Sequence, residues 1–315
     1  MLPRLLDCIF GVLIVCHHAR SGFALSAVRR SHLAGGTPDT QYLFLAHHKT
    51  GTWLTVNFAE DMATLLNTTE TYLSWMPIKD ATESLLGLQV ENDQTKYELA
   101  EGKLLADAVT STECSGHVVF FEDMRVQFLS ELLKRCPGTR AVHLVRRPSS
   151  IVASDYAYTK DLKPGEERQR DFERGENLRN HSLAWGVEEE CNTYFRDYHI
   201  QMLEVHQMIQ AENLDNILEV RLEDFEANYD STTRSIFEHL LGSDHPSIDM
   251  LVKMASQYDV NRMDQVVVAN MSHISEKSDK AEVKTEMTRL LESGNLCVKA
   301  LREADAYMGY TEPTF

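Results

Sequence analysis

Hydrophobic residues gather along the chain in short runs, and a helix-like pattern follows each run. Four such runs stand at 42–46, 117–121, 141–145 and 217–220. Short, mostly apolar runs of this kind are typical of strands buried on both faces of a parallel sheet. Their alternation with helices predicts an α/β fold with a central parallel sheet and helices on both faces. A chain of 315 residues without an internal repeat is long enough to form one such domain.

The segment after the first run carries the first candidate chemistry. Residues 41–55 read QYLFLAHHKTGTWLT, an apolar run that breaks into a short loop and resumes as a helix. Backbone N–H groups at a helix N-terminus attract anions, and Gly51 lets the backbone approach an oxyanion closely. Lys49 adds a full positive charge. The segment therefore predicts an anion-binding loop, although it is not a Walker A loop, because its lysine precedes its only glycine.

A second segment, 139–160, reads TRAVHLVRRPSSIVASDYAYTK and repeats the plan of strand, turn and helix. Arg146 at the strand end offers a planar fork for a phosphate. Pro148 suits the first turn of a helix, and Ser154 adds a hydroxyl about two turns along. Taken alone, the Arg-Arg-Pro sequence could equally be a solvated strand end.

These two segments resemble the 5′-phosphosulfate loop and the 3′-phosphate motif of the PAPS-dependent sulfotransferases. Residues 48–54 are similar to the family's loop but one threonine short, and Arg146 and Ser154 keep the family's spacing. Residues 216–242 and the closing 308–310 resemble two later family motifs, of mostly structural role. The resemblance spans residues 41 to about 310 and implies a fold like that of the P-loop NTPases.

The resemblance also implies roles for individual residues. Lys49 would neutralise the leaving phosphate, the loop N–H groups with Thr50 and Thr52 would hold the 5′-phosphate, and Arg146 with Ser154 would hold the 3′-phosphate. Lys277 or Lys280 could add charge. The expected cofactor is PAPS, with no metal, and the residues expected to bind it are His48, Lys49, Thr50, Gly51, Thr52, Trp53, Arg146 and Ser154.

An acceptor hydroxyl needs a general base within hydrogen-bond reach. Besides Lys49, we expect Glu122 to be the catalytic residue, with Asp123 second and His47 or His48 as further candidates. Glu122 could instead be a helix-start acid or a partner of Arg125. His143 lies on a strand and is expected simply to pack in the core.

The formal charge of −17 bears on the acceptor. A protein this acidic repels polyanions over its general surface, which argues against nucleic acid as a partner. We therefore expect a sulfotransferase that acts on a hydroxyl, less readily an amine, of a glycan or small molecule. A kinase-like P-loop enzyme and a non-catalytic relative that binds a nucleotide or glycan are the alternatives.

The first residues suggest where the protein resides. Residues 1–26 hold about a dozen mostly apolar residues and a small-x-small site, which favours a cleaved signal peptide. A short signal anchor that tethers the protein to a membrane is the alternative, and an organellar transit peptide is a third. Residues 27–40 would be a linker and 41–315 the sulfotransferase domain.

Two further features favour the secretory pathway and the Golgi lumen. N-x-[ST] sequons stand at Asn67, Asn180 and Asn270, and four cysteines outside the leader allow three pairings, one of which joins Cys114 to Cys136. The irregular stretch 72–115 is expected to supply acceptor-binding loops. The charged stretch 161–177 is expected to be a surface loop or lid.

Overall fold

The structure is a computed structural model, and it describes residues 40–74, 114, 117–163, 169–195, 200–264, 277–311 and 315. Side chains are described for all of these except 69–74, 169–171 and 277–278. The leader, nearly all of the linker, most of the expected acceptor loops and Asn270 lie outside the described residues, and so does the side chain of Lys277. The predictions about them stay predictions.

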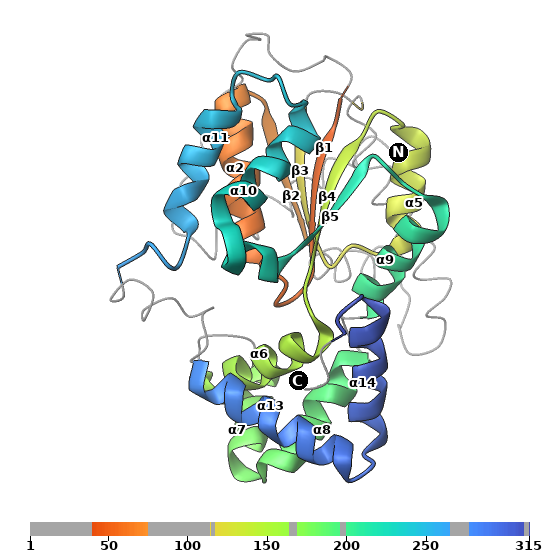
Figure 1. The fold of residues 1–315 in the computed structure, drawn as a ribbon, viewed down its shortest axis with the longest axis vertical. Coiled ribbons are helices and arrows are strands. Elements are labelled where there is room, and N and C mark those ends of the chain that lie inside the picture. Colours follow the sequence, from red (N-terminus) through yellow and green to blue (C-terminus); the bar gives the residue numbers. More distant parts are fainter. Residues whose placement is uncertain are drawn as a thin grey trace, which may run out of the picture.

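A five-stranded sheet forms the centre of the fold (Figure 1). Its order is β2-β3-β1-β4-β5, and every neighbouring pair is parallel. The strands are β1 Tyr42–Ala46, β2 Thr69–Ser74, β3 His117–Glu122, β4 Arg140–Val145 and β5 Ile217–Arg221. The four predicted strands are confirmed to within one residue at each end. The pattern did not predict β2, whose sequence TETYLS is only partly apolar.

Helices cover both faces of this sheet, as predicted. Phe44, Phe120 and Val142 share a core with α2 (Thr52–Leu66), α10 (Leu222–Leu241) and α11 (Ile248–Ala255). On the other face, Leu43 and Val119 share a core with α5 (Val126–Arg135) and α9 (Ile200–Glu212). This alternation along each strand buries both faces, which explains why the strands read as continuous apolar runs.

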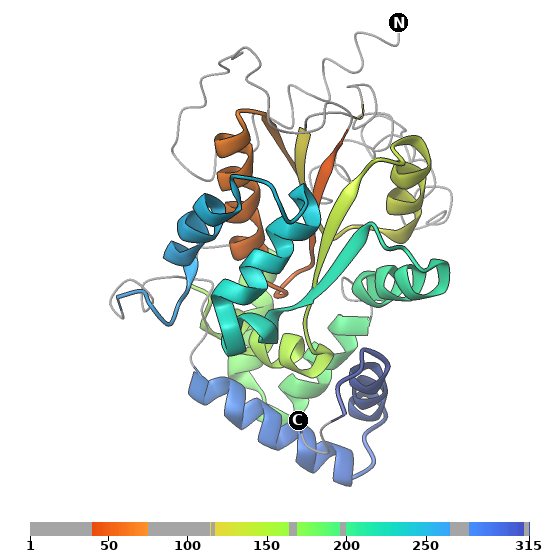
Figure 2. The same ribbon diagram turned by 45° about the horizontal axis from the view of Figure 1, so that its top comes forward.

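A third group of helices lies beyond the carboxyl ends of the strands (Figures 1 and 2). It has its own apolar core, which includes Val152, Tyr156 and Met287. Its members are α6 Pro148–Asp161, α7 Gln169–Asn180, α8 Leu183–Thr193, α13 Lys277–Glu292 and α14 Leu296–Tyr307. The strand β4 leads directly into α6 of this group, so the described loops at this edge lie next to a helical layer.

The prediction of a surface loop at 161–177 is wrong for most of that stretch, because residues from Gln169 onward form α7. The charged composition resembled that of a solvated loop, but one of these charges, Arg174, pairs inside the protein. Arg174 donates hydrogen bonds to Asp155 and Glu190. Gly175 packs so closely on α6 that an added Cβ would overlap the carbonyl oxygen of Thr159.

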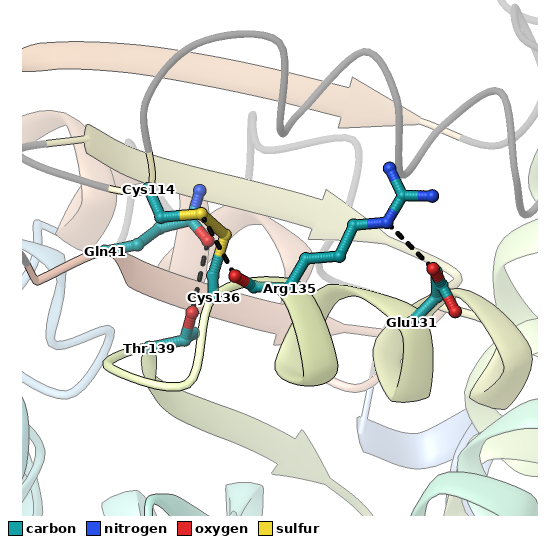
Figure 3. The surroundings of a disulfide bond; sticks show 6 residues. All are labelled: Gln41, Cys114, Glu131, Arg135, Cys136 and Thr139. Carbon is teal, nitrogen blue, oxygen red and sulfur yellow. Dashed lines mark hydrogen bonds and ion pairs between the residues drawn. A yellow bond between two sulfur atoms is a disulfide. The ribbon is translucent and has the colours of Figure 1, made fainter.

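Two disulfides join the four described cysteines. Cys114 pairs with Cys136, as in one of the three predicted pairings, with 5.4 Å between the Cα atoms (Figure 3). Cys191 pairs with Cys297 across α8 and α14, with a Cα separation of 6.1 Å. Within the described part of the chain, no helix is long and apolar enough to cross a membrane.

Candidate functional site

The loop between β1 and α2 is a closed turn. The N–H of His47 donates to Thr50 Oγ1 at 2.8 Å, and the same hydroxyl donates to the carbonyl of His47 at 2.8 Å. Lys49 and Gly51 have φ values of 62° and 109°, in the left-handed region. A Cβ at Gly51 would also lie 3.0 Å from Leu144 and from Leu222, so only glycine fits this position without strain.

The two threonines of the loop shape it from within. Thr50 is fully buried, and its backbone N–H also donates to the carbonyl of His47 at 2.9 Å. Thr52 Oγ1 donates to the same carbonyl at 3.2 Å. Both hydroxyls thus stabilise the turn in this structure, and their expected contact with a phosphate stays a prediction.

Arg146 connects the second motif to the first. Its Nη1 donates to the carbonyl oxygen of Lys49 at 2.9 Å, so the end of β4 and the loop after β1 form one unit. Burial lowers the pKa of Arg146, against the opposing effect of Glu223, Glu226 and Tyr310. A guanidinium nevertheless stays protonated in proteins. The fold thus brings together Lys49 and Arg146, which lie 97 residues apart in the sequence.

Aromatic rings support the cations of this site. The ammonium of Lys49 lies 3.1 Å from the ring centroid of Tyr158 on α6. The guanidinium carbon of Arg147 lies 4.9 Å from the ring centroid of Tyr310, whose hydroxyl donates to Glu223 at 3.0 Å. Tyr310, in the segment 308–310, thus packs against Arg147.

Two helices begin beside these cations. α2 starts at Thr52 after Gly51, and α6 starts at Pro148 after Arg147. Neither N-cap residue, Gly51 or Arg147, makes a side-chain capping hydrogen bond, and neither helix has an acid in its first turn. At α6, however, Asp305 Oδ1 accepts a hydrogen bond from the backbone N–H of Ser149 at 2.9 Å, so a carboxyl group already occupies the start of that helix. The positive end of the α2 dipole adds to the charges of Lys49 and Arg146, an arrangement that can bind an anion.

A further cation comes from α13. Lys284 has a lowered pKa because of burial and because Arg147 and Arg146 lie nearby. The sequence pattern pointed to Lys277 or Lys280 instead. A usable signal existed, because residues 277, 280 and 284 fall on one face of a helix.

Asp123 holds the loop from the β3 side. Its Oδ1 accepts a hydrogen bond from the backbone N–H of His48 at 2.9 Å, and its own N–H donates to the carbonyl of Ala46 at 2.9 Å. Asp123 is buried and has a φ of 59°. Burial, with a contribution from Glu122, raises the pKa of Asp123 to about 7, although His48 and Arg125 oppose the rise.

The ring of His48 contacts a carboxylate that the sequence pattern did not single out. His48 Nε2 lies 2.9 Å from Asp155 Oδ1, on α6. Arg174 bonds the other oxygen of Asp155 and also Glu190. Burial alone would raise the pKa of Asp155, but His48, Arg174 and Lys49 hold it well below its ordinary value. An acid inside a helix that is otherwise almost wholly buried was the available signal.

A second network begins at His47, the preceding residue. His47 Nε2 lies 3.0 Å from His143 Nε2, and His143 Nδ1 lies 3.2 Å from Glu219 Oε2. His206 Nδ1 lies 2.7 Å from Glu219 Oε1. His143 is buried, as expected for a packed residue, but it is also a hydrogen-bonded link between the loop and β5.

The remaining predicted residues lie at the same edge of the sheet. Glu122 ends β3 in register with Ala46 of β1. Ser154 is buried on α6. Trp53 packs edge-on against Tyr258 with 5.5 Å between ring centroids, so its contact with adenine stays a prediction.

The absence of a metal also stays a prediction. Within the described ranges, no group of three or more His, Cys, Asp and Glu side chains is placed to hold a metal ion.

No protein-family model and no curated protein sequence matches this chain. Several solved structures are similar to it, and two of them are sulfotransferases named below. One is the mouse sulfotransferase SULT7A1 complexed with PAP, with 12% identity over 86% of this chain and 91% of that chain and a TM-score of 0.42. The other is the sulfotransferase domain of the olefin synthase of Synechococcus PCC 7002, with 14% identity over 92% of this chain and 100% of that chain and a TM-score of 0.39.

Both of these proteins are sulfotransferases. At these scores and identities the likeness carries no argument about the activity of this chain. The functional proposal therefore rests on the chain's own residues.

Proposed function

We propose that this protein is a sulfotransferase that moves a sulfuryl group from PAPS to a hydroxyl of a glycan or small molecule. One observation carries the proposal. Arg146 donates to the carbonyl of Lys49, which joins the arginine after β4 and the lysine after β1 into a single anion site.

The charges of this site suit a donor with two phosphate-bearing ends. Lys49 and the start of α2 would hold the 5′-phosphosulfate. Arg146, Arg147 and Lys284, with the Ser154 hydroxyl, would hold the 3′-phosphate that distinguishes PAPS from ATP. A site with fixed cations and a helix N-terminus can stabilise the negative charge of the leaving phosphate without reorganising.

The transfer itself needs mainly positioning and charge stabilisation, as phosphoryl transfer does. The acceptor oxygen attacks the sulfur while the bond from sulfur to the bridging phosphate oxygen breaks. PAP leaves with the electron pair, and Lys49 neutralises its charge. The base that takes the acceptor proton is expected at the same edge, where Glu122, Asp123 and His48 are the candidates.

We also propose that the protein works in the lumen of the secretory pathway, such as the Golgi. Two disulfides support this, since such bonds persist in oxidising compartments. The sequons at Asn67 and Asn180 lie at helix ends. Glycosidase treatment of the protein expressed in secretory cells would shift its electrophoretic mobility; a protein that stays in the cytosol without glycans would contradict this proposal.

The donor site is tested by thermal and urea unfolding with PAP, with Mg²⁺-ATP and without ligand. Binding to the native state at a hundredfold excess over Kd adds ~2.7 kcal/mol to the free energy of unfolding. We expect this gain with PAP, and we expect Lys49→Ala and Arg146→Ala to abolish it. Arg146→Lys should lose most of it too, since an ammonium cannot replace the planar fork.

Arg234→Ala is a matched control, because this arginine pairs with Asp249 on the surface, away from the site. No gain with PAP would overturn the proposal. A gain with Mg²⁺-ATP alone would favour a kinase-like enzyme, and a gain with PAP without any turnover of PAPS would favour a non-catalytic relative.

A further inference from the structure

His48 belongs to the donor loop, but a separate network holds its side chain. The side chain is 35% exposed, while that of Asp155, its partner at 2.9 Å, is 7% exposed. The backbone N–H of His48 is bound by Asp123 Oδ1 at 2.9 Å. The residue is therefore fixed at its backbone from β3 and at its ring from α6, while part of the ring faces solvent.

Asp155 is itself held in place. Arg174 bonds Asp155 Oδ2 and Glu190, and its Nη2 also donates to Thr159 Oγ1 at 3.0 Å. The guanidinium keeps the Asp155 carboxylate ionised and sets its orientation. An ionised carboxylate only accepts hydrogen bonds, so His48 Nε2 carries the proton and Nδ1 carries the lone pair.

We propose that His48 is the general base of the transfer and that Asp155 positions it. This inference rests on the proposed sulfotransferase function. In the step, the acceptor oxygen bonds to sulfur and its proton moves to His48 Nδ1. The bond between sulfur and the bridging oxygen breaks, and PAP departs with that electron pair. The resulting imidazolium is stabilised by Asp155, as a carboxylate stabilises histidine in other acid–base pairs.

The position of His48 favours it over the two neighbouring acids. His48 directly precedes Lys49, whose ammonium would lie at the leaving group. Asp123 is buried and uses an oxygen to anchor the loop backbone, which makes it a positioning residue. Glu122 ends β3, which lies on the opposite side of β1 from β4 and its Arg146.

Several titratable and charged groups face His48. Asp155 faces it from α6, Asp123 faces it from the turn after β3, and Lys49 lies beside it on the loop. Arg174 and Glu190 stand behind Asp155. Of these groups, the Asp155 carboxylate is the one that meets the ring at Nε2, at 2.9 Å.

The first test measures PAP formed from PAPS with a panel of simple alcohols and phenols, and with water where no other acceptor reacts. His48→Gln should reduce the rate at least ~100-fold and remove the fall in rate at low pH, since a general base contributes that much. In this proposal His48 would contribute to PAP binding through its backbone while its ring is held by Asp155, so the stabilisation by PAP should remain. His181→Gln is the matched control, because this exposed histidine contacts only its own helix end and Trp185 among the contacts described.

The second test records ¹⁵N spectra of the histidine rings in the PAP-bound protein. We expect His48 to be protonated at Nε2 with a bare Nδ1 at neutral pH. Asp155→Asn should weaken that preference and shift the acid limb of the rate profile to lower pH, with PAP binding retained. A purely structural role of Asp155 would not move that limb.

The outcomes separate this inference from the proposed function. A His48→Gln variant that keeps the wild-type rate, or a proton found on Nδ1, would overturn the base assignment while PAP binding still supports the donor site. If Glu122→Gln and not His48→Gln removes the acid limb, Glu122 is the base. A wild-type protein that binds no PAP, or forms none from PAPS, would overturn both.

Discussion

His47 and His48 are neighbours in the sequence but differ in almost every physical respect. The ring of His47 is buried beneath the loop, whereas the side chain of His48 is about one-third exposed. His47 contacts another histidine, and His48 contacts a carboxylate. Two identical residues thus serve the two sides of one turn.

The networks behind them run into different layers. From His47 the contacts pass along the sheet, through His143 on β4 to Glu219 on β5 and His206 on α9. From His48 they pass into the helical layer, through Asp155 on α6 to Arg174 on α7 and Glu190 on α8. The loop after β1 is therefore held between the sheet and the helices, and of its two histidine rings that of His48 is the partly exposed one.

The largest effect is expected on the helical side. Arg174→Ala would leave the Asp155 and Glu190 carboxylates buried without their shared guanidinium. Removing one partner of a buried ion pair costs about 3–5 kcal/mol in the free energy of unfolding. Urea unfolding at neutral pH measures it, with Arg234→Ala at the exposed pair with Asp249 as the control expected to change little. Equal small losses in both variants would contradict this prediction.

The next effect concerns Asp123, whose pKa is raised from 3.8 to about 7. The folded state then binds a proton that the unfolded state has lost, so this residue's contribution to stability falls as pH rises between those values. The stability of the wild type relative to Asp123→Asn should fall by on the order of 4 kcal/mol across that window. Urea unfolding at a series of pH values tests it, and a flat difference would show that Asp123 is ionised in the fold.

Glu219 should show the opposite slope. Burial tends to raise the pKa of Glu219, but the hydrogen bonds with His143 and His206 lower this pKa from 4.5 to about 2. Its stabilising contribution is therefore complete above 4.5 and is lost as pH falls toward 2. As pH rises from about 2 to 4.5, the free energy of unfolding of the wild type should rise by roughly 3 kcal/mol relative to that of Glu219→Gln. Urea unfolding at a series of pH values measures this change. A stability difference that falls as pH rises, as expected for Asp123, would contradict the network around Glu219.

The smallest effect compares the two histidines directly. His47→Gln disturbs a buried hydrogen bond and should lower the free energy of unfolding by about 1–3 kcal/mol. His48→Gln should lower it by less than about 1 kcal/mol, because its ring is partly hydrated. Turnover should show the reverse order, with the larger loss in His48→Gln. Equal losses of stability in the two variants would contradict the expected difference between the buried His47 and the partly exposed His48.

Much of the sheet and part of the site could be predicted from the sequence. The strands at 42–46 and 141–145 were readable because burial on both faces makes them continuously apolar. The anion loop was readable because glycine and lysine stand next to a helix start. The strand β2 was missed because its residues are mixed in polarity. The helix α7 was mistaken for a loop because its charged composition is typical of solvated segments, and the inward pairing of Arg174 cannot be read from that composition.

The sequence by itself determined four of the five strands, the glycine-containing turn after β1 and the positions of Lys49 and Arg146 at strand ends, because these follow from local patterns of polarity and backbone freedom. Only the tertiary structure decided which carboxylate meets which histidine. Asp155 lies more than a hundred residues from His48 and reaches it because α6 crosses the carboxyl ends of the strands. Pairings of this kind depend on how helices pack on the sheet edge, and no local pattern records that packing.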